Sequence, residues 1–258
     1  AALLFAVHPV HTEAVSNVSG RSDLLFSLFS LAGVCCFVQP SRFGTPGASL
    51  ACLLACFSKE TAILLPFFLI FCDLIWKPHS IPHVVSYLWN RFRTFHIWTF
   101  SALVLFLSLR TFVVGNLTPV PPSPMDNPLV EAPFASRILT LPVLVLHYLK
   151  LLVAPFSLSP DYSFNQIPVV STPDHGLFLA GTLILALVSL AVARCWGRSR
   201  VGIFGVGLTV FPLILTLNPF MTAGSILAER YLYLPSAGFC LLVGLAALRL
   251  RPSWLALP

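Results

Sequence analysis

Two histidines and a carboxylate near the start of the chain are the first residues whose types and spacing could do chemistry. His8, His11 and Glu13 follow one another closely, and Pro9 suits the start of a helix, so the three side chains could share one face of a turn. A metal site would need them to converge with further ligands, and their spacing matches no zincin pattern. The alternatives are polar caps at a membrane interface and a cluster that faces substrate.

Arg21 and Asp23 come next in a chain that carries few charges. Their proximity to Glu13 favours the substrate-facing cluster, and the alternative is that Arg21 and Asp23 simply pair with each other.

Three further charges interrupt apolar sequence. Lys59 and Glu60 stand side by side between two apolar runs, where a side chain buried toward the bilayer centre costs about 2.5 to 3.5 kcal/mol. Such a pair faces protein or water, either as a salt bridge between helices or as a substrate contact. Arg110 lies about one turn inside the end of another run, where it either snorkels to the interface or holds a phosphate with its guanidinium fork.

Two polar stretches complete the set. The first contains Asp161 in a Pro-Asp turn, with Tyr162 beside it and Asn165 and Gln166 following. It predicts either an Asx-turn or the rim of a sugar site. The second places Glu229 and Arg230 as adjacent opposite charges ahead of the last apolar run, where Tyr residues are expected but charges are not.

Composition defines the environment of these residues. Hydrophobic residues make up 57% of the 258 positions, charged residues only 9%, and the mean hydropathy is +0.89. An ordinary soluble domain carries roughly 25% charged residues, so a soluble enzyme is excluded, and disorder is excluded by the high hydrophobicity. The seven cysteines fall in or beside apolar runs and form neither a disulfide framework nor a zinc pattern.

The sequence therefore predicts an all-α, polytopic transmembrane bundle. Residues 48–76 are expected to form a helical hairpin that turns near Lys59 and Glu60. The apolar runs are Leu24 to Val38, Ala48 to Phe57, Thr61 to Trp76, His96 to Val114, Leu139 to Phe156, Leu177 to Cys195, Val201 to Leu217 and Leu234 to Leu250.

Basic loops predict the orientation. Arginines near positions 91–93, 194–200 and 249–251 mark the cytosolic side. This arrangement requires an even number of crossings between the first two loops, so we expect Leu139 to Phe156 to dip into the membrane and return. All the candidate residues then lie on the non-cytosolic face, together with glycosylation sequons at Asn17 and Asn116.

Three stretches carry a resemblance to a known family. Residues 3–31, 58–74 and 226–242 read LLFAVHPVHTEAVSNVSGRSDLLFSLFSL, SKETAILLPFFLIFCDL and ILAERYLYLPSAGFCLL, and Asp126 to Pro128 adds a fourth point. They resemble the transmembrane and tetratricopeptide repeat-containing O-mannosyltransferases, which are glycosyltransferases of the C-type membrane fold. Animal members carry a Phe-Asp-Trp-Ser type stretch where this chain has Pro160 to Ser163, which is closer to bacterial or protist relatives.

The resemblance implies transfer of mannose from dolichyl-phosphate-mannose to Ser or Thr of secretory-pathway proteins, with cadherin-type domains among the acceptors. It implies location in the endoplasmic reticulum membrane, or in the bacterial inner membrane for a prokaryotic relative. Both ends of the chain look cut, so residues 1–258 are expected to form part of a transmembrane glycosyltransferase domain. The first spans, with the presumed acidic catalytic base, are expected upstream, and the tetratricopeptide repeats downstream. Such a fragment is expected to be inactive alone.

Roles follow for the candidate residues on this hypothesis. An inverting transfer needs cations to hold the phosphate leaving group, and Arg110, Arg230 and Lys59 are the candidates, in that order. Glu13, Asp161 and Glu229 are candidates for contacts with the sugar or the acceptor, and neither a metal nor a cofactor is required. Supporting roles are expected for His8, His11, Arg21, Asp23 and Glu60. Alternative functions are transfer of another lipid-linked sugar, transport, or a non-catalytic membrane scaffold.

Overall fold

The structure is a computed structural model, and it describes residues 1–39, 43–76, 84–115, 121–163, 166–173, 175–196, 199–218 and 222–249. All the regular elements in these ranges are helices. They are α1 (Ala2–Ala6), η1 (Pro9–His11), α2 (Thr12–Ser16), η2 (Val18–Gly20), α3 (Arg21–Val38), α4 (Gly44–Ser58), η3 (Glu60–Leu64), α5 (Leu65–Trp76), α6 (Val84–Arg91), η4 (Phe92–His96), α7 (Ile97–Val114), η5 (Pro128–Val130), α8 (Phe134–Val153), α9 (Gly176–Trp196), α10 (Arg200–Val210), α11 (Leu213–Thr216), η6 (Glu229–Leu232) and α12 (Tyr233–Arg249).

Five helical segments are long and apolar enough to cross a membrane, which confirms the all-α, multi-span prediction. Each of the eight apolar runs falls in a helix. The membrane-length segments are Val18–Val38, Val84–Val114, Phe134–Val153, Gly176–Cys195 and Glu229–Arg249. The likeness to the C-type fold stays a prediction.

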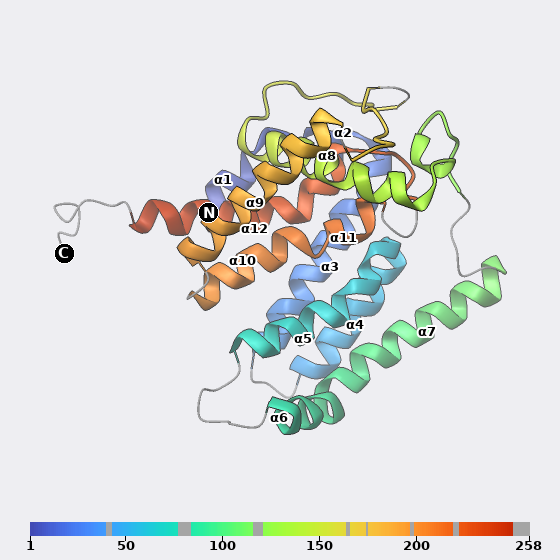
Figure 1. Cartoon of the computed structure of the whole chain (residues 1–258). Coiled ribbons are helices and arrows are strands. Elements are labelled where there is room, and N and C mark those ends of the chain that lie inside the picture. Colours follow the sequence, from blue (N-terminus) through green and yellow to red (C-terminus); the bar gives the residue numbers. More distant parts are fainter. Residues whose placement is uncertain are drawn as a thin grey trace.

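The helices form two packed groups (Figure 1). In the first, α3 packs along α4 and α4 along α7; in the second, α10 packs along α12 and α8 along α9. The α10–α12 contact is close because both helices carry glycine at the crossing. A Cβ atom added to Gly238 would lie 2.5 Å from the carbonyl oxygen of Gly205.

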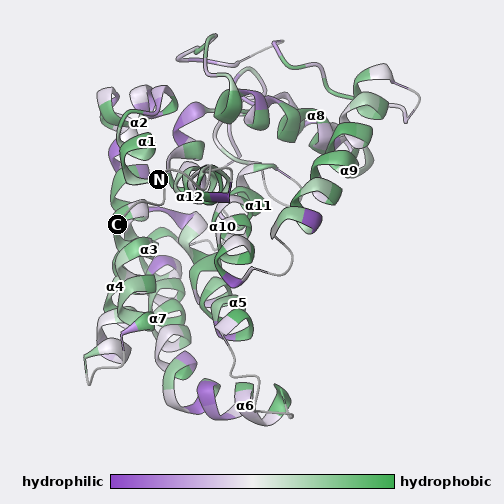
Figure 2. Cartoon of the chain, turned by 90° about the vertical axis from the view of Figure 1, so that its left-hand side faces the viewer, coloured by the Kyte–Doolittle hydropathy of each residue, from purple (hydrophilic) through white to green (hydrophobic). Residues whose placement is uncertain are grey.

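The segment Leu139 to Phe156 does not turn back on itself as predicted. It forms most of α8, one uninterrupted helix that runs across the top of the molecule in Figure 2, whereas α3, α4 and α7 run down the left side. The helix continues through Pro142 because its buried face, which includes Val143, Leu144 and Tyr148, packs into a continuous hydrophobic cluster.

The chain breaks its helical path at Lys59, as the sequence predicted. The backbone of Lys59 is extended, with φ −157° and ψ 138°, so α4 ends at Ser58 and η3 begins at Glu60. This single extended residue directs two adjacent charged side chains toward different neighbours.

Candidate functional site

Three pairs of opposite charges lie close to one another at one end of the helices. They are Asp23 with Lys59, Glu13 with Arg230, and Glu60 with Arg110. The six residues come from α2, α3, the break before η3, α7 and η6, so the fold collects side chains that are up to 217 positions apart. The sequence named all six as candidates, and the structure brings them together.

Lys59 is fixed between a carboxylate and an aromatic ring. Its Nζ forms a salt bridge with Asp23, which lies in the first turn of α3, where a helix N-terminus favours a negative charge. The same ammonium lies 4.3 Å from the ring centroid of Tyr231. Asp23 therefore pairs with Lys59, and the pairing of Asp23 with Arg21 that the sequence allowed is not formed; Arg21 is exposed.

Arg230 is held by Glu13 through two hydrogen bonds. One carboxylate oxygen of Glu13 accepts from the guanidinium at 2.5 Å, and the other accepts from the backbone N–H of Arg230 at 2.9 Å. The guanidinium also donates to Ser225 Oγ at 3.3 Å. The adjacent charges Glu229 and Arg230 do not pair with each other, because consecutive residues of a helical turn point in different directions.

Glu229 instead anchors the loop that precedes α9. Its Oε1 accepts from the backbone N–H of Ser159 at 2.7 Å and from the hydroxyl of Tyr162 at 2.8 Å. Burial, reinforced by the hydrogen bond to this carboxylate, raises the pKa of the Tyr162 phenol. Asp161, in contrast, is exposed and forms an Asx-turn in which it accepts from the N–H and the hydroxyl of Ser163. Asn165 lies outside the described residues.

A groove lies beside the three charge pairs. It encloses about 480 Å³, and the charged residues among the described ones that line it are Lys59, Glu60 and Arg110. Its other walls come from α7 and the segment between α11 and η6, including Phe106, Thr216, Gly224 and Tyr231. We refer to it as the basic groove.

A second hollow opens next to Glu13. Its two charged lining residues are Glu13 and Glu229, and its remaining walls are formed by Thr12, Ser16, Asn17, Val18 and residues 158–160. We refer to it as the acidic cleft. Arg230 contacts Glu13, which lines this cleft, and Ser225, which is adjacent to Gly224 of the basic groove. The side chain of Asn17 in the first sequon is exposed here, whereas Asn116 lies outside the described residues.

The two histidines are structural in this arrangement. His8 Nδ1 accepts from the N–H of Val10, so Nε2 carries the proton and donates to the carbonyl of Leu152 at 3.0 Å. His11 Nε2 bonds to Ser236 Oγ at 2.7 Å, and burial together with the nearby His8 lowers the pKa of His11 to about 4. Within the described ranges, no three His, Cys, Asp or Glu side chains lie close enough to hold one metal ion.

An asparagine pair that we did not predict as site residues braces one wall of the basic groove. The fully buried Asn127 donates to Asn218 Oδ1 at 3.0 Å and to the carbonyl of Ala223 at 2.8 Å. Asn218 adopts a left-handed backbone, with φ 63°, and accepts from the N–H of Ala223. The Asp-Asn-Pro stretch was noted only for its resemblance, and the isolated Asn218 offered no pattern in the sequence.

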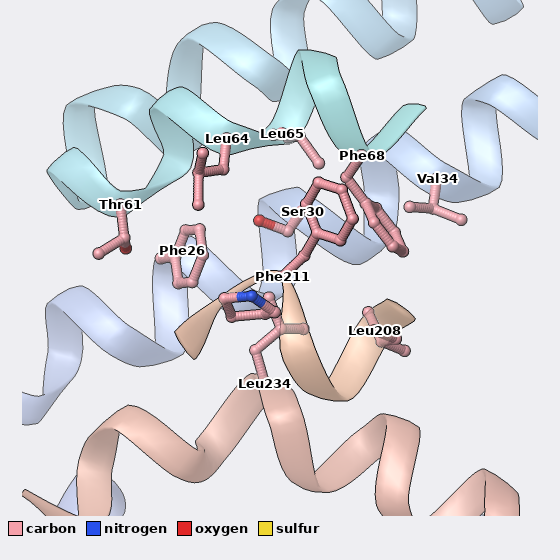
Figure 3. A pocket seen from close by; sticks show the side chains of 11 residues that line it. Phe26, Ser30, Val34, Thr61, Leu64, Leu65, Phe68, Leu208, Phe211 and Leu234 are labelled. Carbon is pink, nitrogen blue, oxygen red and sulfur yellow. The ribbon is translucent and has the colours of Figure 1, made fainter. Parts of the chain in front are cut away.

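A small apolar pocket continues from the basic groove toward the helices (Figure 3). It lies between α3, η3, α5, the α10–α11 segment and α12, and shares Thr61 with the groove. Two buried hydroxyls that line it, Ser30 Oγ and Thr61 Oγ1, have no hydrogen-bond partner among the described residues.

Comparisons with known proteins relate this arrangement to one group of membrane proteins. A family model described as "Protein O-mannosyl-transferase TMTC, DUF1736" matches residues 118–188. The chain is 30% identical to protein O-mannosyl-transferase F38B6.6 of Caenorhabditis elegans and 31% identical to TMTC4 of Homo sapiens, in each case over 94% of its length. It is 29% identical to human TMTC3, again over 94%. No solved structure matches the chain.

These alignments also show how much of the relatives the chain represents. It covers 33% of the Caenorhabditis elegans protein, 37% of human TMTC4 and 29% of human TMTC3. The chain thus spans about a third of the length of the curated relatives it matches.

Proposed function

The chain belongs to the TMTC family of protein O-mannosyl-transferases, and from this premise we propose that it forms the membrane core of an enzyme that transfers mannose to Ser or Thr hydroxyls of secretory-pathway proteins. The observation that carries the proposal is the basic groove beside the acidic cleft, with Glu13 and Arg230 between them. A transferase must hold two substrates of different charge next to each other, and these two hollows differ in this way.

The basic groove suits the phosphate of a lipid-linked donor, for which we propose dolichyl-phosphate-mannose. A guanidinium offers paired N–H donors to phosphate oxygens, and Lys59 adds a second cation on the same wall. Arg230 reaches toward this groove through Ser225. Cations that are already in place stabilise the leaving phosphate without reorganising during the reaction.

The acidic cleft suits the acceptor, because a hydroxyl and the backbone N–H groups of an extended peptide are hydrogen-bond donors. Glu13 and Glu229 provide carboxylate oxygens at its base. The resemblance places the carboxylate that removes the hydroxyl proton upstream of Ala1, so these two glutamates orient the acceptor and the sugar in our scheme. Asp161, held by Ser163, is the weakest of the three candidates for this contact.

The proposed setting is the lumenal face of the endoplasmic reticulum membrane, with cadherin-like proteins among the acceptors and tetratricopeptide repeats downstream in the full-length protein. The scheme routes no step through a metal ion. Transfer by the full-length protein should therefore survive treatment with a chelator.

Substitution of Arg110 tests the donor site. In the full-length protein, Arg110→Ala should lower donor use at least about tenfold, because a guanidinium that binds a charged leaving group is lost. The measurement is mannose transfer against donor concentration, with Arg230→Lys as a second variant that keeps a charge beside Glu13. Arg93→Ala is the matched control, because Arg93 is exposed on η4, outside the groove. Unchanged transfer by Arg110→Ala at normal expression would remove this donor site.

A further inference from the structure

The basic groove contains a carboxylate at a place where an anionic ligand would bind. Glu60 is the only acidic residue among the described ones that line the groove, and its Oε1 lies 2.6 Å from a guanidinium nitrogen of Arg110. A guanidinium binds a carboxylate and a phosphate with the same fork of N–H donors. The two anions would therefore compete for one partner.

The three carboxylates of the charge pairs differ sharply in exposure. The side chain of Glu60 is 45% exposed, whereas those of Asp23 and Glu13 are 5% and 4% exposed. Separation of Asp23 or Glu13 from its cation would leave an uncompensated charge in the protein interior, which is costly. Glu60 would instead return to water, so its ion pair is the easiest of the three to open.

Other contacts reinforce this difference. Asp23 also accepts nothing less than a buried ammonium, and Glu13 receives a backbone N–H in addition to the guanidinium of Arg230. For Glu60, the described residues provide the Arg110 contact alone. Arg110 is only 14% exposed, so its guanidinium stays in the groove wall when Glu60 leaves.

We propose that Glu60 is a placeholder for the donor phosphate: it occupies the Arg110 guanidinium while the groove is empty, and the phosphate displaces it on binding. The inference rests on the proposed donor site. It adds a positioning and regulatory role for Glu60, whose carboxylate neutralises Arg110 between turnovers and lowers the affinity of the groove for other anions.

The proposal predicts that two neighbouring substitutions act in opposite directions. In the full-length protein in detergent micelles, Glu60→Gln should lower the Kd for fluorescent dolichyl phosphate roughly threefold to fivefold, because it removes the competing charge of a half-exposed pair. Arg110→Ala should raise that Kd, and the gain from Glu60→Gln should vanish in the double variant. Glu131→Gln, at an exposed glutamate outside the groove, controls for the general effect of removing one negative charge.

The outcomes separate this proposal from the proposed function. If Arg110→Ala weakens binding while Glu60→Gln leaves it unchanged or weakens it, the placeholder is wrong and the donor site stands. If neither variant changes binding, both are wrong. A loss of kcat in Glu60→Gln with an unchanged Kd would also overturn the placeholder, because it would place Glu60 in the chemical step. Inorganic phosphate as competitor separates the headgroup contribution from that of the isoprenoid chain.

Discussion

A second buried charge cluster lies at the opposite end of the molecule from the basic groove. Asp73 of α5 accepts from Arg91 Nε at 3.1 Å, contacts His96 Nε2 at 2.6 Å and accepts from the Tyr87 hydroxyl at 3.4 Å. All three partners come from residues 87–96, a short stretch in α6 and η4. In the groove region, by contrast, each cation has its own carboxylate, and the pairs join segments far apart in the sequence.

The hollows beside the two regions differ as well. The one next to His96 is lined by apolar side chains, namely Ile70, Val85, Leu88, Trp89 and Phe92. One carboxylate surrounded by several donors and an apolar hollow fastens helices together, but it leaves no cation available to a ligand. An ion pair indicates a binding site only when a partner with access to water can be exchanged, which is the situation of Arg110 and Glu60.

The largest effect expected from this comparison is on stability alone. Asp73→Ala should destabilise the protein by about 3 to 5 kcal/mol, because it leaves the buried His96 and the half-buried Arg91 without their shared carboxylate. Thermal unfolding in detergent measures the loss. Protein that remains folded should bind dolichyl phosphate with the Kd of the unsubstituted chain. A variant with normal stability but impaired donor binding would show that the two ends do not have separate roles.

The sequence predicted the charged half of the site better than its geometry. Apolar runs interrupted by rare charges identify residues that must be paired or functional, because an unpaired charge in a membrane is costly. This argument found Glu13, Lys59, Arg110 and Arg230. Their partners could not be read from spacing, since Glu13 and Arg230 meet only after the helices between them have packed.

Local spacing was misleading in two places for the same reason. Arg21 with Asp23 and Glu229 with Arg230 are neighbours in the sequence, yet Asp23 and Arg230 pair with residues of other elements. Charges one or two positions apart on a helix do not face each other. The Asp73 cluster was missed because Asp73 lies inside an apolar run and its partners follow in a segment that we read only as a cytosolic loop.

The two buried histidines sharpen the comparison through pH. His96 faces the carboxylate of Asp73, whereas His11 faces the hydroxyl of Ser236, and burial lowers the pKa of His11 to about 4 from 6.5. The unfolded chain therefore takes up a proton at His11 at higher pH than the folded protein does. This contribution to stability is complete above pH 6.5 and is lost progressively as the pH falls from about 6.5 to about 4.

Thermal unfolding at a series of pH values checks the prediction for His11. His11→Gln should reduce the decline in stability across this window by about 1 to 2 kcal/mol, because the amide does not titrate. His8→Gln serves as the control for loss of an adjacent imidazole. An identical pH profile in the unsubstituted chain and in His11→Gln would contradict the assignment of this titration to His11.

The smallest expected effect concerns the wall of the acidic cleft. Tyr162→Phe removes one of the two hydrogen bonds to Glu229 Oε1 and leaves the N–H of Ser159 in place. Because a donor to the carboxylate remains, we expect a loss of about 1 kcal/mol in stability. Since the cleft is proposed to hold the acceptor and the groove the donor, the KM for an acceptor peptide should rise while the Kd for dolichyl phosphate stays constant. A matched rise in both constants would mean that the cleft and the groove act as one site, and the contrast between an acceptor side and a donor side would then fail.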